Sequence, residues 1–456
     1  MDIEGFRKAG YQAIDRICDY YYSLQKLPVV AQVQPGYLAK VYHTRLDALA
    51  APQREQSGIQ LDEQPSMHRA GDGRDGLGGE TLGLGDHFMN SSAEGGGVIQ
   101  TTASEACIVV CVAARSLYMR QHPDAKLEEL VIYTTSQTHS LGVKAGLVLG
   151  LEVRIIDVKA EDDFALRGEA LRTTLETDVG KGKRPFIIIA TVGTTSSGAV
   201  DRLGEIGEVL KEYPSVWLHV DAAWAGVTMA CPEYRGTARL EDINKFATSF
   251  GTNFHKWGLI NFDASMLWVR NRKHLTDALD VTPEILRSQQ HIAGVVIDYR
   301  NWHLGLGRRF RSLKVWFVLR SYGVEGFRKH IREGIALNEY FASLLRDFPD
   351  ISIVTPPSFA LTVFRLVPCG SWDHSAPITE ELLNMLNRAF YARLSARSDI
   401  LLTQTVLNGM FCVRFAVGAT RTTVEHIDIA WEIIKEEALI ALKDSELKVD
   451  SSQGVI

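Results

Sequence analysis

The sequence contains no apolar run that approaches the roughly 20 residues a membrane-spanning helix needs. Its 49 Lys and Arg residues nearly balance its 55 Asp and Glu residues, for a formal net charge of -6, which argues against a protein that binds polyanions through bulk charge. The first residues, Met1-Asp2-Ile3-Glu4, have neither the basic nor the apolar segment of a signal peptide. We therefore expect a cytoplasmic protein that binds neither membranes nor nucleic acids.

Cysteine is also scarce, since the chain of 456 residues has only six. Cys107 and Cys111 lie four residues apart, but no second pair of Cys or His residues completes a zinc site. Scattered cysteines in a long chain are typical of reduced, mostly buried thiols in a cytosolic protein. We therefore expect free thiols and no metal site.

The rest of the composition is that of an ordinary globular protein, with 46% hydrophobic and 23% charged residues. At roughly 100–200 residues per domain, the length indicates two or three domains. The pattern along the chain predicts an N-terminal helical segment at 1–90, a large domain at 91–310 and a small C-terminal domain at 311–456.

Strands alternate with helices in the large domain. Strand-like apolar runs appear at 130–134, 153–158, 185–191, 216–220 and 264–269, with helical stretches near 104–120, 139–150, 164–178 and 201–212. This alternation predicts an α/β fold with a mostly parallel sheet covered on both faces. After residue 311 the order predicts a small α+β domain, with helices at 313–346, 380–397 and 423–443, strands at 351–354, 361–366 and 411–417, and a frayed polar tail at 448–456.

The N-terminal region has two contrasting parts. Residues 5–24 have apolar side chains on one helical face, and this helix has so little of its own chain to pack against that we expect it to dock on another domain or subunit. Residues 43–80 have neither helical nor strand periodicity, and five of the ten residues from Gly71 to Glu80 are glycine. Structureless loops of this length are uncommon inside compact domains.

The strongest chemical signal is Asn253-Phe254-His255-Lys256-Trp257. Lys256 lies among apolar and aromatic neighbours. A lysine in a dry pocket has a lowered pKa, so its free amine can form a Schiff base with an aldehyde. A surface lysine whose stem lies on apolar neighbours is the alternative interpretation.

A second signal lies upstream, where an apolar strand ends in His219-Val220-Asp221-Ala222-Ala223. Ligands of open α/β sheets bind outside the carboxyl ends of the strands. An aspartate at that place can keep a pyridine nitrogen protonated, and the small Ala223 would let a flat ring lie against the backbone. An aspartate that caps a helix is the alternative interpretation.

A third signal combines the glycines at 95–97 with the hydroxyls of Thr102 and Ser104, directly before a predicted helix. Such a helix start offers backbone N–H groups, hydroxyls and a helix dipole to a phosphate. A capping box built on Thr102 is the alternative, and it needs no ligand.

Two weaker signals follow predicted strands: His139 comes after 130–134, and Gly193-Thr194-Thr195 comes after 185–191. All five signals lie near the ends of successive strands or at a helix start. Together they describe a site for a phosphorylated pyridine aldehyde.

The ordered set of motifs resembles the group II pyridoxal-phosphate-dependent amino-acid decarboxylases, close to the aromatic-amino-acid and histidine enzymes. The resemblance covers nearly the whole chain except 43–80. The stretches that carry it are Gln34-Pro35-Gly36-Tyr37-Leu38, GGGVIQ with ASEA (95–106), HVDAAWAG (219–226), NFHKW with NFD (253–263) and LGRRFRSLKVWF (306–317).

The resemblance implies the type I fold of pyridoxal-phosphate enzymes, a homodimer with exchanged N-terminal helices, pyridoxal 5′-phosphate as cofactor and a small amino acid as substrate. It implies three catalytic residues: Lys256 resembles the Schiff-base lysine, Asp221 the partner of the ring nitrogen, and His139 the histidine stacked on the ring. Positions that match the family's cofactor-binding residues are Thr102, Ala103, Ser104, His139, Thr195, Asp221, Ala223, Asn253, His255 and Lys256.

Residues 43–80 depart from the family, whose longer segment here supplies much of the aromatic side-chain pocket across the dimer interface. If Ser57–Gly79 is back-translated with permitted codons and read one nucleotide later, it can give AGFNWMSSPPCTELEMVVMDWVG, which resembles the missing segment. Only the wobble base of each shifted codon is free, so a match of this length by chance is improbable. A reading-frame artefact and genuine divergence are the two hypotheses.

The second departure is Ile285. Family decarboxylases usually have a tyrosine at this position, on a mobile loop, that protonates the carbon from which CO2 departs. Relatives with phenylalanine tend toward oxidative decarboxylation and deamination to an aldehyde. Isoleucine has no proton to give. Gly307, in contrast, resembles the aromatic-amino-acid enzymes, because histidine decarboxylases tend to have serine there.

Three functional hypotheses follow. The first is decarboxylation of an aromatic L-amino acid to its amine and CO2. The second is an aromatic aldehyde synthase, because of Ile285. The third is a catalytically impaired, dimer-forming protein or gene-model product, because of residues 43–80.

Overall fold

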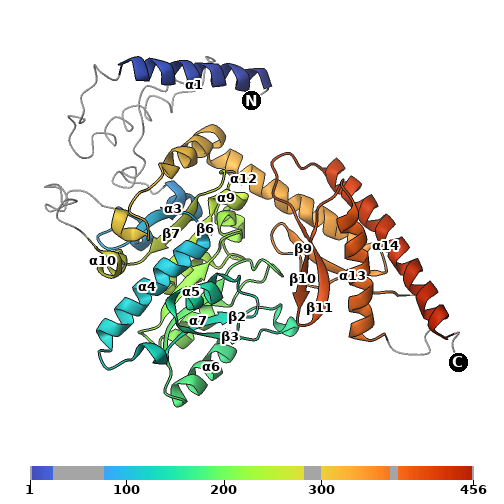
Figure 1. Ribbon diagram of the computed structural model, residues 1–456, viewed down its shortest axis with the longest axis horizontal. Helices are drawn as coiled ribbons and strands as arrows, with labels where there is room; N and C mark the ends of the chain where they lie inside the picture. Colours follow the sequence, from blue (N-terminus) through green and yellow to red (C-terminus); the bar gives the residue numbers. More distant parts are fainter. Residues whose placement is uncertain (1–2, 24–76, 282–298, 370–377, 454–456) are drawn as a thin grey trace. The chain divides into compact units, whose positions relative to one another are not determined.

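The computed structural model describes residues 3–23, 77–281, 299–369 and 378–453 (Figure 1). The chain forms two compact units, Met1–Gly58 and Ile59–Ile456. In the first unit, helix α1 (Ile3–Ser23) confirms the predicted N-terminal helix, and none of its residues is buried. Its docking on another domain or subunit stays a prediction.

The large domain is built on a seven-stranded sheet with the order β1-β7-β6-β5-β4-β2-β3. Strands β2 to β6 pair in parallel, and β7 runs antiparallel to both β6 and β1. The strands are β1 (Gly96–Gln100), β2 (Leu130–Thr135), β3 (Glu152–Ile156), β4 (Arg184–Thr191), β5 (Trp217–Asp221), β6 (Ser249–Asn253) and β7 (Ser265–Val269). The predicted mostly parallel sheet is therefore confirmed.

Helices cover both faces of this sheet. Alternate residues of β4 point to opposite sides, so that Ile187 and Ile189 join one hydrophobic cluster while Ile188 and Ala190 join the other. One cluster lies under α4 (Ala103–Gln121), α5 (Leu141–Leu149) and α10 (Lys273–Leu279), and the other under α6 (Gly168–Gly180), α7 (Leu203–Leu210) and α8 (Leu240–Phe246). Burial on both faces explains why the central strands are continuous apolar runs.

The small domain pairs three helices with a four-stranded antiparallel sheet of order β10-β11-β9-β8. The elements are α12 (Arg311–Arg346), β8 (Ile351–Ile353), β9 (Leu361–Leu366), α13 (Glu380–Ala396), β10 (Thr403–Leu407), β11 (Met410–Ala416) and α14 (Val424–Gln453). The predicted α+β pattern is confirmed. The boundary between the domains at 310 and 311 stays a prediction.

Three sequence predictions need correction. Residues 77–80 were expected to be irregular, but they begin helix α3 (Leu77–Leu82), in which Gly79 packs against Met89 and Trp268. The last helix was expected to end at 443, but it continues to Gln453, since no glycine or proline interrupts it before Gly454. Strands β1, β6 and β10 were missed because their short, partly polar sequences lack a clear apolar run.

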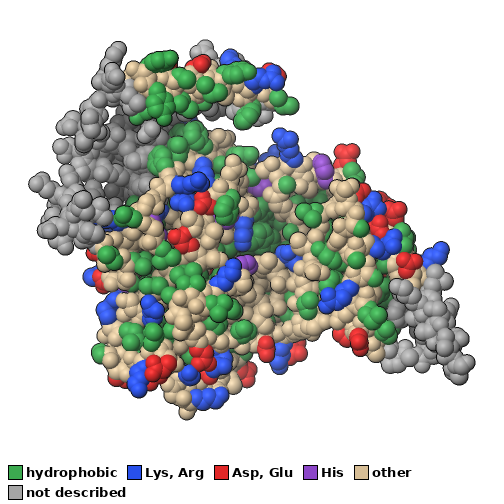
Figure 2. Space-filling model, in the orientation of Figure 1, with side chains coloured by type: hydrophobic (Ala, Val, Ile, Leu, Met, Phe, Trp, Pro, Cys, Tyr) green, Lys and Arg blue, Asp and Glu red, His purple; other side chains and the backbone are tan. Residues whose placement is uncertain are grey.

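The cysteines and the surface agree with the composition. All six cysteines are free, and Cys107, Cys111, Cys231 and Cys412 are buried. On the face shown in Figure 2, acidic and basic side chains are interspersed rather than gathered into one patch. None of the described helices is both long and apolar enough to cross a membrane.

Candidate active site

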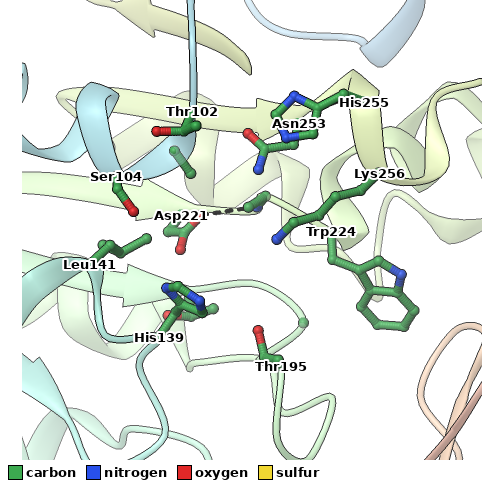
Figure 3. A pocket seen from close by; sticks show the side chains of 14 residues that line it. Thr102, Ser104, His139, Leu141, Thr195, Asp221, Trp224, Asn253, His255 and Lys256 are labelled. Atoms are coloured by element: carbon green, nitrogen blue, oxygen red, sulfur yellow. Dashed lines mark hydrogen bonds between the residues drawn. The ribbon is translucent and has the colours of Figure 1, made fainter. Parts of the chain in front are cut away.

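The carboxyl ends of β4, β5 and β6 meet at one edge of the sheet. The parallel register pairs Thr191 with Asp221 and Asp221 with Gly251. Beside these ends lies a cavity of about 190 Å³ (Figure 3). All ten predicted site residues line it, together with Leu141, Thr191, Gly193 and Trp224. The sheet topology thus brings together residues that are more than 150 positions apart in the sequence. The individual roles of these residues stay predictions.

Asp221 is the last residue of β5 and is only 3% exposed. Its Oδ1 accepts a hydrogen bond of 2.9 Å from the Ala223 backbone N–H, drawn as a dashed line in Figure 3. Burial raises the pKa of the Asp221 carboxyl, and the positive charge of Lys256 lowers it. The helix-cap interpretation is wrong, because the 3₁₀ helix that follows has Trp224 as its N-cap residue. The second carboxylate oxygen is therefore left for a cationic partner.

Lys256 lies in the short helix α9 (Phe254–Trp257), directly after β6. Its side chain is accessible, but it faces the cavity, and Figure 3 shows the amine pointing into the space beside Asp221. Burial lowers the pKa of Lys256, the negative charge of Asp221 raises it, and the positive charge of Arg414 lowers it. The net lowering favours a free amine. Its place in the cavity lining favours the reactive lysine over a surface lysine, and its role stays a prediction.

The start of α4 is both capped and open to an anion. Thr102 is the N-cap residue, and its Oγ1 accepts a hydrogen bond of 3.1 Å from the Glu105 N–H. The Glu105 carboxylate accepts from the Thr101 N–H and hydroxyl in return. The backbone N–H groups of Ala103 and Ser104 have no hydrogen-bond partner in the described part of the chain. Thr102 therefore caps the helix without a complete capping box, because Glu105 bonds to Thr101 rather than to the Thr102 N–H. The phosphate site at this helix start stays a prediction.

His139 is placed by a tight turn between β2 and α5. Within this turn the Thr135 hydroxyl accepts hydrogen bonds of 3.1 Å from the Gln137 N–H and 3.0 Å from the Thr138 N–H. Burial lowers the pKa of His139, as does the positive charge of Lys256. A neutral imidazole is therefore favoured at the cavity wall.

His255 and Asn253 also present polar atoms to the cavity. The His255 Nδ1 accepts a hydrogen bond of 2.8 Å from the Ala264 N–H, so that its proton is carried on Nε2. Burial lowers the pKa of His255, which favours this neutral form. Asn253 is 3% exposed, and its side-chain oxygen is buried without a hydrogen-bond partner. An orphaned buried oxygen of this kind is typical of a site that receives a ligand.

These residues fit pyridoxal phosphate. Two unpaired N–H groups and the hydroxyls of Thr102 and Ser104 suit a phosphate, Asp221 suits a protonated ring nitrogen, and Lys256 suits an aldehyde. When bound, this cofactor supplies an electron-withdrawing pyridine ring that stabilises a carbanion.

The structure adds two residues that the sequence analysis did not assign to the site. Trp224 lies within the HVDAAWAG stretch (219–226), whereas Arg414 has no local signal in the sequence. Arg414 acts on Lys256 from β11 of the small domain, far away in the sequence. Trp224 lines the cavity and stacks on Trp257 with ring centroids 5.6 Å apart. Within the described residues, no group of three or more His, Cys, Asp or Glu side chains could hold a metal ion.

Comparison with known proteins gives this site a family. Residues 77–367 match the sequence model of the pyridoxal-dependent decarboxylase conserved domain. The chain belongs to this family. It is therefore a carboxy-lyase that depends on pyridoxal phosphate, and its predicted type I fold is confirmed by a solved relative, Oryza sativa TDC with PLP and tryptamine. That structure superimposes with a TM-score of 0.75 at 32% identity, covering 96% of this chain and 98% of the other.

Curated decarboxylase-family relatives match over nearly their full length. The chain is 38% identical to tryptophan decarboxylase 2 of Oryza sativa subsp. japonica, over 96% of this chain and 95% of the relative. It is also 38% identical to phenylacetaldehyde synthase of Arabidopsis thaliana, over 96% of each chain. With aromatic-L-amino-acid decarboxylase of Rattus norvegicus it shares 35% identity, over 97% of this chain and 99% of the relative.

Proposed function

We propose that this decarboxylase removes the α-carboxylate of an aromatic L-amino acid and releases the amine and CO2. The observation that carries the proposal is the cavity that joins Asp221, Lys256 and the open start of α4. The names of the tryptophan and aromatic-L-amino-acid decarboxylases support an aromatic substrate.

Each side chain has a part that its surroundings favour. Lys256, with a lowered pKa, is the free amine that attaches the cofactor covalently. Asp221, buried beside it, keeps the ring nitrogen protonated. His139, kept neutral by burial, would hold the cofactor ring at the cavity wall, and the small Ala223 would leave room for its flat face. Thr102, Ala103 and Ser104 bind the phosphate.

Two measurements test this proposal. Borohydride reduction followed by peptide mapping should label Lys256 with the cofactor. Release of CO2 should be faster from L-tryptophan, L-tyrosine or L-phenylalanine than from L-histidine. Labelling of another lysine would remove Lys256 from its assigned role, and a preference for L-histidine would overturn the substrate class.

The aldehyde synthase is the second candidate. It is favoured by Ile285, which cannot donate a proton, and by the match to phenylacetaldehyde synthase, which is as identical to this chain as the tryptophan enzyme. Ile285 lies outside the described residues. The products separate the two reactions: an amine identifies the decarboxylase, while ammonia, hydrogen peroxide and an aldehyde identify the synthase.

A catalytically impaired chain is the third candidate, and it is motivated by the segment 43–80. Residues 43–76 of this segment lie outside the described residues. The family model begins to match at residue 77, directly after this stretch. The alignment with tryptophan decarboxylase 2 spans 484 positions, more than the 456 residues of this chain, so the relative contains residues that this chain lacks. Sequencing the transcript across the codons for residues 40–85 distinguishes a frame artefact from divergence.

A homodimer in the cytoplasm completes the proposal. The dimer is supported by α1, whose apolar residues Phe6, Ile14 and Ile17 are all more than half exposed. Removal of residues 1–23 should convert a dimer into a monomer in analytical ultracentrifugation.

The cytoplasmic location is supported by the six free cysteines. Fractionation of cells that express a tagged chain tests this location.

A further inference from the structure

The segment that follows β4, here named the β4 loop (Thr191–Asp201), closes on itself. At its neck the Thr191 N–H donates to the Asp201 Oδ2 at 2.7 Å, and the Asp201 N–H donates back to the Thr191 carbonyl at 3.0 Å. Inside the loop, the N–H groups of Gly193 and Thr194 both donate to the Ala199 carbonyl at 3.0 Å. This bonding gives the loop a defined shape.

Asp201 is completely buried. Its second carboxylate oxygen accepts a hydrogen bond of 2.7 Å from the Leu166 N–H, in the segment before α6. Both oxygens thus hold backbone N–H groups from two separate parts of the chain. The carboxylate fixes the neck of the β4 loop to the body of the large domain, and loss of either bond would leave a buried backbone N–H group without this acceptor.

One side of the β4 loop faces the cavity. Thr191, Gly193 and Thr195 line it, and Figure 3 shows Thr195 across the space from Asp221. The Val192 N–H also donates to the Asp221 carbonyl at 3.0 Å. A displacement of the loop would therefore move Thr195 directly, and it would move Asp221 through the backbone hydrogen bond from Val192.

The other side of the β4 loop faces the small domain. The Thr355 hydroxyl donates to the Ser197 carbonyl at 3.2 Å, and the Ser358 hydroxyl donates to the Gly198 carbonyl at 2.7 Å. Gly198 has φ +74, and a Cβ added there would lie 2.7 Å from the Ser358 Cβ. The fit at the loop tip is thus close enough to exclude a single methyl group.

The small-domain partner is itself held in place. Ser358 and Leu361 exchange backbone hydrogen bonds of 3.0 Å in a tight turn. The side chain of Asn338, fully buried in α12, donates to the Phe359 carbonyl at 3.3 Å. Ser358 is therefore fixed to the small domain through its turn and through α12, so that a movement of the small domain would also move Ser358.

We propose that Asp201 and Ser358 are positioning residues for the cofactor site. Asp201 holds the neck of the β4 loop and Ser358 holds its tip, so that the placement of the small domain sets the position of Thr195 beside the cofactor. The inference rests on the proposed place of Thr195 near the ring. A purely structural contact would affect stability without affecting cofactor affinity, and this difference makes the inference testable.

The first experiment is a double-mutant cycle on Gly198 and Ser358, read as the dissociation constant of pyridoxal phosphate in a spectroscopic titration. Gly198→Ala should weaken binding by roughly tenfold and Ser358→Gly by roughly threefold. The combined variant should be no weaker than roughly threefold, because removal of the Ser358 Cβ relieves the clash. The matched control is Gly182→Ala, since Gly182 has φ +79 but nothing within 4 Å of an added Cβ.

The control separates positioning from strain. Gly182→Ala should lower the thermal midpoint as Gly198→Ala does, yet leave cofactor affinity unchanged. Equal affinities for Gly198→Ala and Gly182→Ala, or simple multiplication of the two single effects in the combined variant, would overturn the assignment of Ser358.

The second experiment compares two buried aspartates. Asp201→Asn leaves one of the two backbone N–H groups without an acceptor and should weaken pyridoxal phosphate binding by roughly tenfold. Asp178→Asn is the control, because Asp178 is 2% exposed but bonds to Arg154 and Tyr133 away from the cavity. It should lower the thermal midpoint and leave the affinity unchanged. Equal affinities for both variants would overturn the assignment of Asp201.

If the chain binds no pyridoxal phosphate, the proposed function is refuted. The role of Asp201 and Ser358 in holding the β4 loop can still be tested without the cofactor. Amide hydrogen exchange of Gly193 and Thr194 reports the loop without any cofactor. Exchange should be faster in Gly198→Ala and Asp201→Asn than in Gly182→Ala. Equal exchange in all three variants would mean that the β4 loop is not held by these residues.

Discussion

Replacement of Asp221 by asparagine tests the electrostatic core of the site. The asparagine side chain can still accept the hydrogen bond of 2.9 Å from the Ala223 N–H, so the end of β5 should keep its shape. The negative charge is lost, however, at a position that is only 3% exposed. The variant therefore separates charge from geometry.

The size of the effect follows from burial. Removal of one partner of a buried charge pair costs about 3–5 kcal/mol. At about 1.4 kcal/mol for each factor of ten, loss of this amount in the transition state should lower kcat by about 10²- to 4 × 10³-fold. The same change should lower the pKa of Lys256 further, because the charge of Asp221 raises it in the native protein.

The assay measures kcat at saturating substrate with the cofactor bound. It uses the chain as given if that chain decarboxylates, and otherwise the chain with Ser57–Gly79 rebuilt. Asp178→Asn again serves as the control, since it removes a buried carboxylate that bonds to the Arg154 Nε at 2.8 Å and lies outside the cavity lining. It should lower the thermal midpoint with little change in kcat. A kcat for Asp221→Asn within about tenfold of the unchanged protein would refute the role of the charge.

Four further predictions follow from the site and its surroundings. Lys256→Ala and Lys256→Arg should abolish covalent cofactor attachment and turnover, and a retained borohydride-stable label would contradict this. Ile285→Tyr should raise the share of amine over aldehyde, as measured by chromatography of the products, because tyrosine can donate a proton. A chain rebuilt with the shifted reading of Ser57–Gly79 and the upstream stretch should gain dimer stability and activity, whereas full activity of the chain as given would refute the artefact hypothesis. Burial raises the pKa of Asp201 from 3.8 to about 6 in the folded protein, so its contribution to stability should fall by on the order of 3 kcal/mol as pH rises from about 4 to about 6, and Asp201→Asn should remove that part of the pH dependence of unfolding.

The sequence by itself determined the class of fold and predicted the candidate site residues that line one cavity. Lys256 and Asp221 were recognisable because each lies in a short local motif beside a strand, and strand ends in an α/β sheet are where ligands bind. The continuous apolar runs of the central strands predicted a sheet buried on both faces, since only helices on each side can bury such runs. Patterns of this kind depend only on residues that are close together in the sequence, so they can be recognised without the tertiary structure.

Only the tertiary structure decided what surrounds those residues. The charge of Arg414 lowers the pKa of Lys256 from another domain, and Ser358 bonds to Gly198, 160 residues away in the sequence. Neither interaction can be recognised from the local sequence. The start of α4 shows the same limit, because the sequence pattern left a capping box and a phosphate site as alternatives. The folded backbone shows that Thr102 caps the helix while the N–H groups of Ala103 and Ser104 stay without partners in the described part of the chain. Burial and long-range contacts depend on how the strands and domains come together, and this arrangement gives Asp221 its raised pKa and Lys256 its lowered one.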